Sequence, residues 1–220
     1  LLGRFIDELF EYKVTLITTS NTHPDNLYKD GLHRSRFIPA IDSIKENCEI
    51  FELDSAQDYR LRTLEQLEIF VVESEGKSIE KLESNFSELT NNEYEENKNI
   101  QILGRKIKTI KLSKGSVWIS FKEICEGPRS AKDYIEICSE FHTVFVSGVP
   151  IMKENNGDAA RRFIALVDEC YERNVNLILS LEANLNEIYR GNRLAEPFKR
   201  TLSRLEEMRS REYLSRPHLI

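Results

Sequence analysis

The segment from Val14 to Asn21 is the part of this chain that most suggests chemistry. Val14 to Ile17 have the apolar and β-branched character of a short strand, and Thr-Thr-Ser-Asn follows directly at positions 18 to 21. In an open α/β sheet, ligands bind beyond the carboxyl ends of strands, which is where Asn21 would lie. An Asn after a strand is also a common turn former, so Asn21 is a weak signal when taken alone.

Arg34 is a second candidate residue for nucleotide chemistry, in addition to Asn21. An Arg on the element after such a strand can project towards the nucleotide of a neighbouring subunit and stabilise transition-state charge, an effect worth roughly a thousandfold or more in rate. Alone, Arg34 is typical of a solvated surface charge. Asn21 and Arg34 together predict part of a site for ATP hydrolysis.

The Gly76-Lys77-Ser78 tripeptide resembles the end of a phosphate-binding loop but lacks the rest of that motif. The motif requires a glycine five residues before its second glycine, and position 71 is valine. Its acidic surroundings also disfavour an anion. We therefore interpret the tripeptide as a chance match, and we assign no catalytic role to any of the four histidines, which lack partners at motif spacing.

Composition limits the class of protein. The chain has 220 residues, 40% of them hydrophobic and 31% charged, which is enough for one or two packed cores. No apolar run approaches the roughly 20 residues of a membrane span, and no signal peptide opens the chain, so we expect an intracellular protein without a membrane segment. The four cysteines show no metal-binding spacing, and we expect them to be reduced and mostly buried.

The net charge of −6 is concentrated in one region. Eight glutamates and three lysines lie between Glu73 and Asn99, and the remainder of the chain is close to neutral. There is accordingly no basic face for a nucleic-acid partner. We expect the acidic region to be a solvated insertion, in which Ile79, Leu82, Phe86 and Leu89 form one weak amphipathic helix.

The elements around Asn21 and Arg34 follow an alternating α/β pattern. Apolar residues from Leu1 to Phe10 have helical spacing, with neither an initiator Met nor a helix cap before them, so we expect the chain to begin inside a domain of a longer protein. A strand is predicted over 14–20, a helix over 38–46 with Pro39 in its first turn, and a strand over 48–53.

The second half of the chain is predicted to begin with a small antiparallel β meander over 100–121. Ser130 and Asp133 form a capping pair for the next helix. A strand over 143–147, a helix over 159–173 and a strand over 175–181 then make a β-α-β unit, and Phe198, Leu202, Leu205 and Met208 place an apolar stripe on a final helix.

The chain resembles the ZapE-type cell-division ATPases and their mitochondrial Afg-type relatives, which are AAA+ proteins. Besides Thr18–Asn21, the segments that carry this resemblance are Pro24–Leu32, Arg34, Phe37–Ile41, Leu53-Asp54, Asp58–Arg60, Gly104-Arg105, Asp133-Tyr134, Phe141–Val144, Val149-Pro150, Ala160–Asp168, Arg200–Leu205 and Glu207-Met208. They extend over nearly the whole chain. Each segment is a weak signal on its own, but the combination of segments is specific to this family.

The resemblance implies a fold and an organisation. It implies an α/β fold with a truncated P-loop-type AAA+ core, a small antiparallel meander, and a β-α-β unit followed by a helix. The corresponding regions would be the end of the ATPase core at 1–62, an acidic insertion or linker at 63–99, and a family-specific α/β region at 100–220.

The resemblance also implies residue roles. Asn21 would orient the attacking water against the γ-phosphate, and Arg34, in the Gly-Leu-x-Arg segment, would be the arginine finger, with Arg36 as the alternative. Four further arginines, Arg60, Arg162, Arg200 and Arg204, would be either phosphate sensors or structural ion-pair formers. For Arg200 and Arg204 we favour the structural role.

The family's phosphate-binding loop and its Asp-Glu magnesium and base pair have no counterpart in this chain. Phosphoryl transfer depends on holding the phosphates and Mg²⁺, so we expect ATP and Mg²⁺ to bind the complete protein but not this part alone. The implied partners are further copies in a ring-type homo-oligomer and a division-machinery protein such as FtsZ, in the bacterial cytoplasm, although mitochondrial relatives exist. The alternative is a non-catalytic α/β protein-interaction module.

Overall fold

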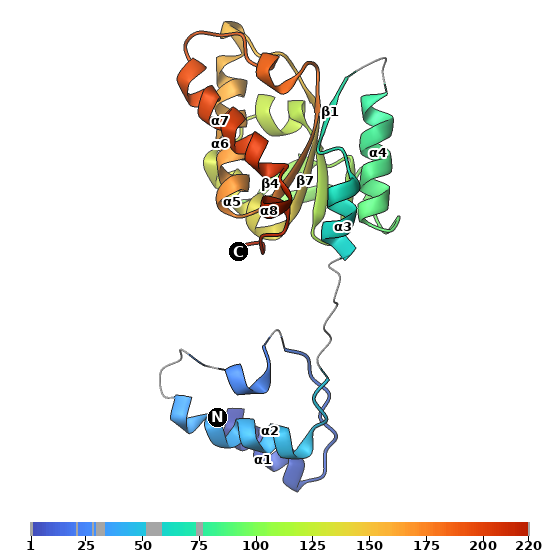
Figure 1. Cartoon of the computed structure of the whole chain (residues 1–220), viewed down its shortest axis with the longest axis vertical. Coiled ribbons are helices and arrows are strands. Elements are labelled where there is room, and N and C mark those ends of the chain that lie inside the picture. Colours follow the sequence, from blue (N-terminus) through green and yellow to red (C-terminus); the bar gives the residue numbers. More distant parts are fainter. Residues whose placement is uncertain are drawn as a thin grey trace. The chain divides into compact units, whose positions relative to one another are not determined.

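A computed structural model describes residues 2–20, 22–27, 29, 34–51, 59–73 and 77–219, and the structural statements below refer to these ranges. The chain divides into two compact units, Leu1–Ala56 and Gln57–Ile220 (Figure 1). Each unit is described by itself.

Unit 1 is a small helical unit. Its elements are α1 (Leu2–Glu11), the short 3₁₀ helices η1 (Pro24–Asn26) and η2 (Arg34–Arg36), and α2 (Ile38–Asn47). Helix α1 packs against α2, and Ile6, Ala40 and Ile41 are buried between them. Pro39 lies in the first turn of α2, where its missing N–H costs no helical hydrogen bond. The two helices predicted for this region are thus confirmed.

The two strands predicted for unit 1 are wrong over the described residues. Residues 14–20 and 48–51 belong to neither sheet, and Ile17 and Phe51 are 91% and 74% exposed. A strand needs a neighbouring strand to bond its main chain, and the described residues of unit 1 supply none. The remaining residues of the second prediction, 52 and 53, lie outside the described residues.

Unit 2 is an α/β unit with a central sheet. Its helices are α3 (Tyr59–Gln66), α4 (Ser78–Leu89), the π-helical turn η3 (Lys122–Glu126), α5 (Ala131–Glu140), η4 (Glu154–Asn156), α6 (Gly157–Glu172), η5 (Leu185–Glu187), α7 (Ala195–Met208) and α8 (Arg211–Leu214). Its strands are β1 (Phe70–Val72), β2 (Glu95–Glu96), β3 (Asn99–Ile102), β4 (Arg105–Lys108), β5 (Lys111–Ser113), β6 (Ser116–Ser120), β7 (Thr143–Val149) and β8 (Asn176–Leu181).

The central sheet of unit 2 has the strand order β1-β8-β7-β6-β5-β2. Strands β1, β8, β7 and β6 are parallel, whereas β5 and β2 pair antiparallel at the far edge. Helices α3 and α4 cover one face, and α5, α6 and α7 cover the other (Figure 1). The mostly parallel sheet between helical layers confirms the predicted α/β fold class.

Alternation of side chains along the strands divides the core between the two faces of the sheet. On β7, Val144 and Val146 point to the α5–α7 side, while Phe145 points to the α3–α4 side. Strand β8 repeats this pattern around Ile178. Because both faces are covered, each strand has a continuous apolar run, Val144–Val146 in β7 and Leu177–Leu179 in β8, which made them recognisable in the sequence.

The acidic region contributes to the core through α4. Leu82 and Phe86 are fully buried against the sheet, whereas Ile79 is exposed. The predicted amphipathic helix is therefore confirmed, and its polar residues form the solvated side. Whether 63–99 is an insertion relative to other proteins stays a prediction.

The predicted meander over 100–121 consists of two antiparallel hairpins in different sheets. Strands β3 and β4 form a separate two-stranded sheet, whereas β5 and β6 belong to the central sheet. The predicted capping box of Ser130 and Asp133 is present at the start of α5. Strand β7, helix α6 and strand β8 confirm the predicted elements with bounds that differ by at most two residues, and helix α7 confirms the predicted final helix.

The four cysteines are unpaired, as the sequence predicted. Cys125, Cys138 and Cys170 are buried, and Cys48 is half-buried. Burial raises the pKa of the Cys125 thiol, so this residue behaves as a small apolar side chain.

Candidate functional site

Arg34 begins η2, and its guanidinium group binds main-chain oxygens of the preceding turn. Nη2 donates to the carbonyl oxygen of Asp25 at 2.7 Å, and Nε donates to that of Leu27 at 3.5 Å. The side chain is half-buried, and Nη1 has no acceptor among the described residues. Two main-chain oxygens of this turn therefore hold the Arg34 side chain.

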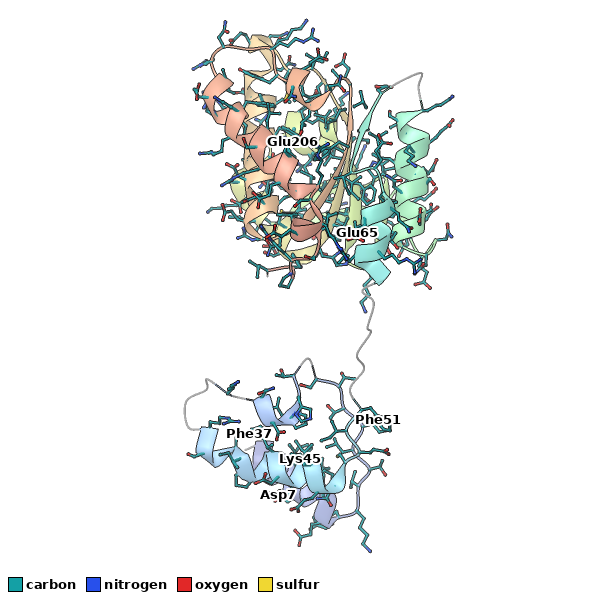
Figure 2. The ribbon with its side chains drawn as sticks, viewed as in Figure 1. Asp7, Phe37, Lys45, Phe51, Glu65 and Glu206 are labelled. Carbon is teal, nitrogen blue, oxygen red and sulfur yellow. The ribbon has the colours of Figure 1, made fainter. Side chains whose placement is uncertain are left out.

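The turn that holds Arg34 is itself tied to α2 by an ion pair. Lys45 Nζ lies 2.7 Å from Asp25 Oδ1, and His23 Nδ1 lies 3.4 Å from Asp25 Oδ2 (Figure 2 labels Lys45). The hydrogen bond from Lys45 is the main cause that lowers the pKa of Asp25. The turn, η2 and α2 thus form one connected support for the Arg34 side chain.

Three other predicted residues are not placed by the structure. Asn21 lies outside the described residues. Arg36 is in η2 and Arg60 is in α3, but their side chains are outside the described part. The roles predicted for these residues stay predictions.

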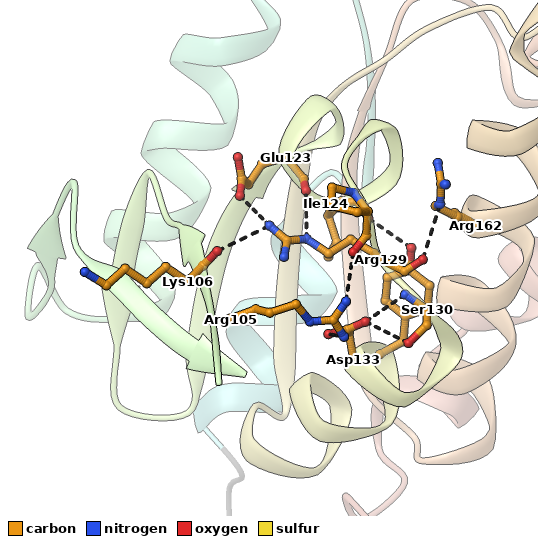
Figure 3. A network of polar contacts seen from close by, with 10 residues as sticks. Arg105, Lys106, Glu123, Ile124, Arg129, Ser130, Asp133 and Arg162 are labelled. Carbon is orange, nitrogen blue, oxygen red and sulfur yellow. Dashed lines mark hydrogen bonds and ion pairs between the residues drawn. The ribbon is translucent and has the colours of Figure 1, made fainter. Parts of the chain in front are cut away.

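Arg162 projects from α6 towards the loop before α5, where it meets main-chain oxygens. Nε donates to the carbonyl oxygen of Arg129 at 3.3 Å (Figure 3). Nη1 donates to the carbonyl oxygen of Cys125 at 3.2 Å. These bonds fasten α6 to the chain between η3 and α5. The phosphate-sensing alternative for Arg162 stays a prediction.

A polar network continues from Arg162 to the β3–β4 hairpin (Figure 3). Arg129 pairs with Glu123 at 2.5 Å, and Arg105 on β4 pairs with the carboxylate of Asp133. Asp133 Oδ2 also accepts from the main-chain N–H and the hydroxyl of Ser130. The capping box therefore has a third participant, Arg105, which attaches the separate hairpin to α5.

Arg200 and Arg204 of α7 form ion pairs with α6. Arg204 lies 2.5 Å from Asp168 and 3.0 Å from Glu172, and Arg200 lies 3.3 Å from Asp168. The ion pairs that the sequence interpretation favoured for these two arginines are thus present.

The Gly76-Lys77-Ser78 tripeptide follows β1 in the sequence, and its last residue begins α4. Strand β1 ends at Val72, and α4 begins at Ser78. A strand followed by a helix is also the context of a phosphate-binding loop, but Val71, a buried residue of β1, occupies the position of the motif's first glycine. Residues 74–76 lie outside the described residues, so the structure adds nothing on the loop itself.

A cleft that the sequence interpretation missed lies at the carboxyl ends of β1 and β8. Strand β1 leads to α4 on one face of the sheet, and β8 leads to α7 on the other. Adjacent strands with this property define the switch point at which doubly wound sheets bind ligands. The sequence signal that could have revealed this cleft is the order strand then helix, which occurs in β1 with α4 and again, far along the chain, in β8 with α7.

No group of three or more His, Cys, Asp or Glu side chains able to hold a metal ion lies among the described residues. No helix in the described ranges is long and apolar enough to cross a membrane.

Comparison with known proteins gives matches over the whole chain. The chain is 43% identical over 219 residues to the cell division protein ZapE of Escherichia coli, which covers 100% of this chain and 58% of that protein. It is 33% identical over 192 residues to lactation elevated protein 1 homolog B of Danio rerio, covering 86% of the chain and 38% of the relative. An uncharacterized protein of Schizosaccharomyces pombe is 32% identical over 191 residues.

The chain thus spans little more than half the length of the bacterial relative and less of the others. No solved structure gives a significant match. The model of the AFG1-like ATPase family matches residues 1–217. This chain is therefore a member of the AFG1-like ATPase family.

Proposed function

We propose that this chain is part of an ATP-hydrolysing AAA+ protein that acts in bacterial cell division in the cytoplasm. The observation that carries the proposal is the match of residues 1–217 to the AFG1-like ATPase family, together with 43% identity to a protein named for cell division. ATP and Mg²⁺ would bind the longer protein, which would supply the phosphate-binding loop and the magnesium ligands.

Exposed apolar side chains in unit 1 support this proposal. Among the residues whose side chains are described, seven of the ten exposed large hydrophobic ones lie there: Phe5, Tyr12, Val14, Ile17, Ile38, Ile50 and Phe51. Such a concentration on a small unit is typical of a surface that packs against something else. We propose that this surface packs against the rest of the ATPase core, where the unpaired segment 14–20 joins a sheet.

Arg34 and Asn21 are the proposed catalytic residues. Arg34 is held by two main-chain oxygens with Nη1 available, which suits a group that must reach a fixed point on a neighbouring nucleotide. Asn21 would orient water in the site of its own subunit. This division of roles implies a homo-oligomer of ring type. Because the chain is similar to a protein named for cell division, we also propose a division-machinery protein such as FtsZ as a partner.

The first experiment replaces Arg34 by Ala in the longer protein. Because a finger acts on the transition state, we expect nucleotide affinity to be nearly unchanged and the hydrolysis rate to fall by roughly a thousandfold. Arg204→Ala is the matched control, since its partners are Asp168 and Glu172, and its rate should stay near that of the parent. Normal turnover of Arg34→Ala would remove Arg34 from the finger role.

A mixing experiment separates catalysis in trans from support of the local turn. Subunits with Asn21→Ala and subunits with Arg34→Ala are each expected to be inactive. In a random one-to-one mixture, about a quarter of the interfaces in a closed ring would combine an intact Asn21 with an intact Arg34 from the neighbour, so activity should return. If Arg34 only stabilised its own subunit, the mixture would stay inactive.

A further inference from the structure

Strand β1 forms an edge of the central sheet, and this edge is open as far as the described residues go. Strand β1 is first in the strand order and pairs only with β8 among the described residues. Leu179 N–H donates to Ile69 O at 2.9 Å, and Glu73 N–H donates to Leu181 O at 2.7 Å. Since alternate residues of a strand direct their main-chain groups to opposite sides, those of Phe70 and Val72 face the open edge.

Two clefts border this edge. One, of 420 Å³, lies at the switch point between β1 and β8, with Phe70, Val72 and Leu185 among its apolar lining. The other, of 330 Å³, lies beside Leu64 and Ile69. Arg209 lines both clefts. The apolar linings of the two clefts therefore lie on either side of Arg209, next to β1.

Charges along the edge are mainly negative. Arg209 pairs with Glu206 and Arg211 pairs with Glu65, each at 2.6 Å (Figure 2 labels Glu206 on α7 and Glu65 on α3). Both cations are therefore neutralised. By contrast, the exposed carboxylates of Glu68, Glu73 and Glu187 have no ion-pair partner among the described residues.

These charges decide between classes of ligand. Unpaired carboxylates and neutralised arginines along this edge disfavour a phosphate or a nucleotide as its ligand, and they favour a ligand that carries cationic groups. The unpaired main-chain groups of Phe70 and Val72 match the main chain of an extended peptide, which is how peptides add to sheet edges.

We infer that the open edge of β1, with the switch-point cleft beside it, binds an extended peptide whose apolar side chains alternate with basic ones. The peptide pairs with the main chain of Phe70 and Val72. Its apolar side chains point to the face of Phe70 and Val72 and enter the switch-point cleft, and its basic side chains point to the opposite face, where Glu73 lies. The site is separate from the nucleotide chemistry proposed above and uses unit 2 alone.

The experiment uses the 220-residue chain and a fluorescein-labelled peptide of sequence Lys-Val-Lys-Val-Lys-Val. Binding is followed by fluorescence anisotropy and its location by amide hydrogen exchange. We expect the amides of Phe70 and Val72 to become protected when peptide is added. The amides of Glu73 and Leu179, already bonded to the sheet, serve as internal references and should change little.

Charge reversal tests the basis of recognition. Glu73→Lys should weaken binding by about tenfold, since the change replaces an attraction by a repulsion. Glu136→Lys, an exposed change on α5, is the matched control and should leave the affinity unchanged. A peptide with Glu in place of Lys should not bind, and one with alternate amides N-methylated should bind weakly.

Three outcomes would overturn the inference. They are protection located elsewhere in the chain, equal affinity for the Lys and Glu peptides, and protection of Phe70 and Val72 without peptide in a self-associated chain. The last result would show that a second copy occupies the edge. Because no nucleotide is used, these outcomes are independent of whether the longer protein hydrolyses ATP.

Discussion

Arg204 Nη1 on α7 lies 2.5 Å from Asp168 Oδ1 on α6. The guanidinium carbon of Arg204 lies over the Tyr171 ring, 4.8 Å from the ring centroid. A second carboxylate, Glu172, lies 3.0 Å away. Arg200 contacts the same Asp168 but is 61% exposed, against 21% for Arg204. The two arginines thus share a partner and differ in burial.

This difference predicts unequal effects of truncation. Arg204→Ala should lower the free energy of unfolding by about 1–2 kcal/mol, because it removes two ion pairs and a cation–π contact at a half-buried site. Arg200→Ala should lower it by less than about 0.5 kcal/mol, as for exposed pairs. Urea denaturation of unit 2 measures both. Equal effects would mean that the shared pairing to Asp168 does not depend on burial.

The capping box at α5 gives a second prediction. The Asp133 side chain is fully buried and accepts from Ser130 N–H at 2.7 Å and Ser130 Oγ at 2.9 Å, besides pairing with Arg105. Asp133→Ala should therefore lower the free energy of unfolding by about 2–3 kcal/mol, and Ser130→Ala by about 1 kcal/mol. Chemical denaturation measures both values.

Glu136→Ala is the control for the capping box. Glu136 is exposed on the same helix, so its loss should change stability by less than about 0.5 kcal/mol. An Asp133→Ala effect no larger than that of Glu136→Ala would show that the cap and the hairpin contact contribute nothing to stability.

The sequence predicted best those elements whose signals are local. Ser130 and Asp133 are three residues apart, and strand β7 contains the apolar run Val144–Val146, so both could be recognised without knowledge of distant contacts. Helix α4 was recognisable from four apolar residues at helical spacing. These features depend on neighbours in the chain and not on the packing of distant segments.

Long-range relationships account for what the sequence did not predict. The segment 14–20 has the composition of a strand, yet a strand also needs a partner, which its composition cannot specify. Likewise, the two hairpins look alike in the sequence but belong to different sheets. The switch-point cleft is lined by both Val72 and Leu185, and only the topology of the sheet reveals that these two residues lie close together.

A third prediction concerns pH and the C-terminal segment. Glu207 accepts from Tyr171 Oη at 2.7 Å and from Arg216 Nη2 at 2.8 Å. The hydrogen bond from Tyr171 is the main cause that lowers the pKa of Glu207, followed by that from Arg216. A depressed pKa in the folded state stabilises the fold above the ordinary glutamate pKa of 4.5 and ceases to do so as the pH falls through the lowered value.

Glu207→Gln should therefore be less stable than the parent chain near neutral pH, and the difference should shrink as the solution is acidified below pH 4.5. Urea unfolding of both chains over this range measures it. Glu80→Gln, an exposed change on α4, should show a small and constant difference. A difference that grew on acidification would contradict the lowered pKa.

The last prediction compares two glycines with the same backbone conformation. Gly104 has φ of +76° and Gly115 has φ of +77°, a region that side chains disfavour. A Cβ at Gly104 would meet nothing within 4 Å, whereas one at Gly115 would lie 2.5 Å from His142 Nε2 and 2.7 Å from its Cδ2. The two positions therefore share the backbone strain, and only Gly115 adds a steric clash.

Gly104→Ala should lower the free energy of unfolding by about 1 kcal/mol through backbone strain alone. Gly115→Ala should cost about 1–3 kcal/mol more, because the His142 ring must move. A double-mutant cycle with His142→Ala isolates that second part, since the clash is absent once the ring is removed. If the cycle gave no coupling between positions 115 and 142, the close approach of the imidazole to Gly115 would not be the cause of the difference.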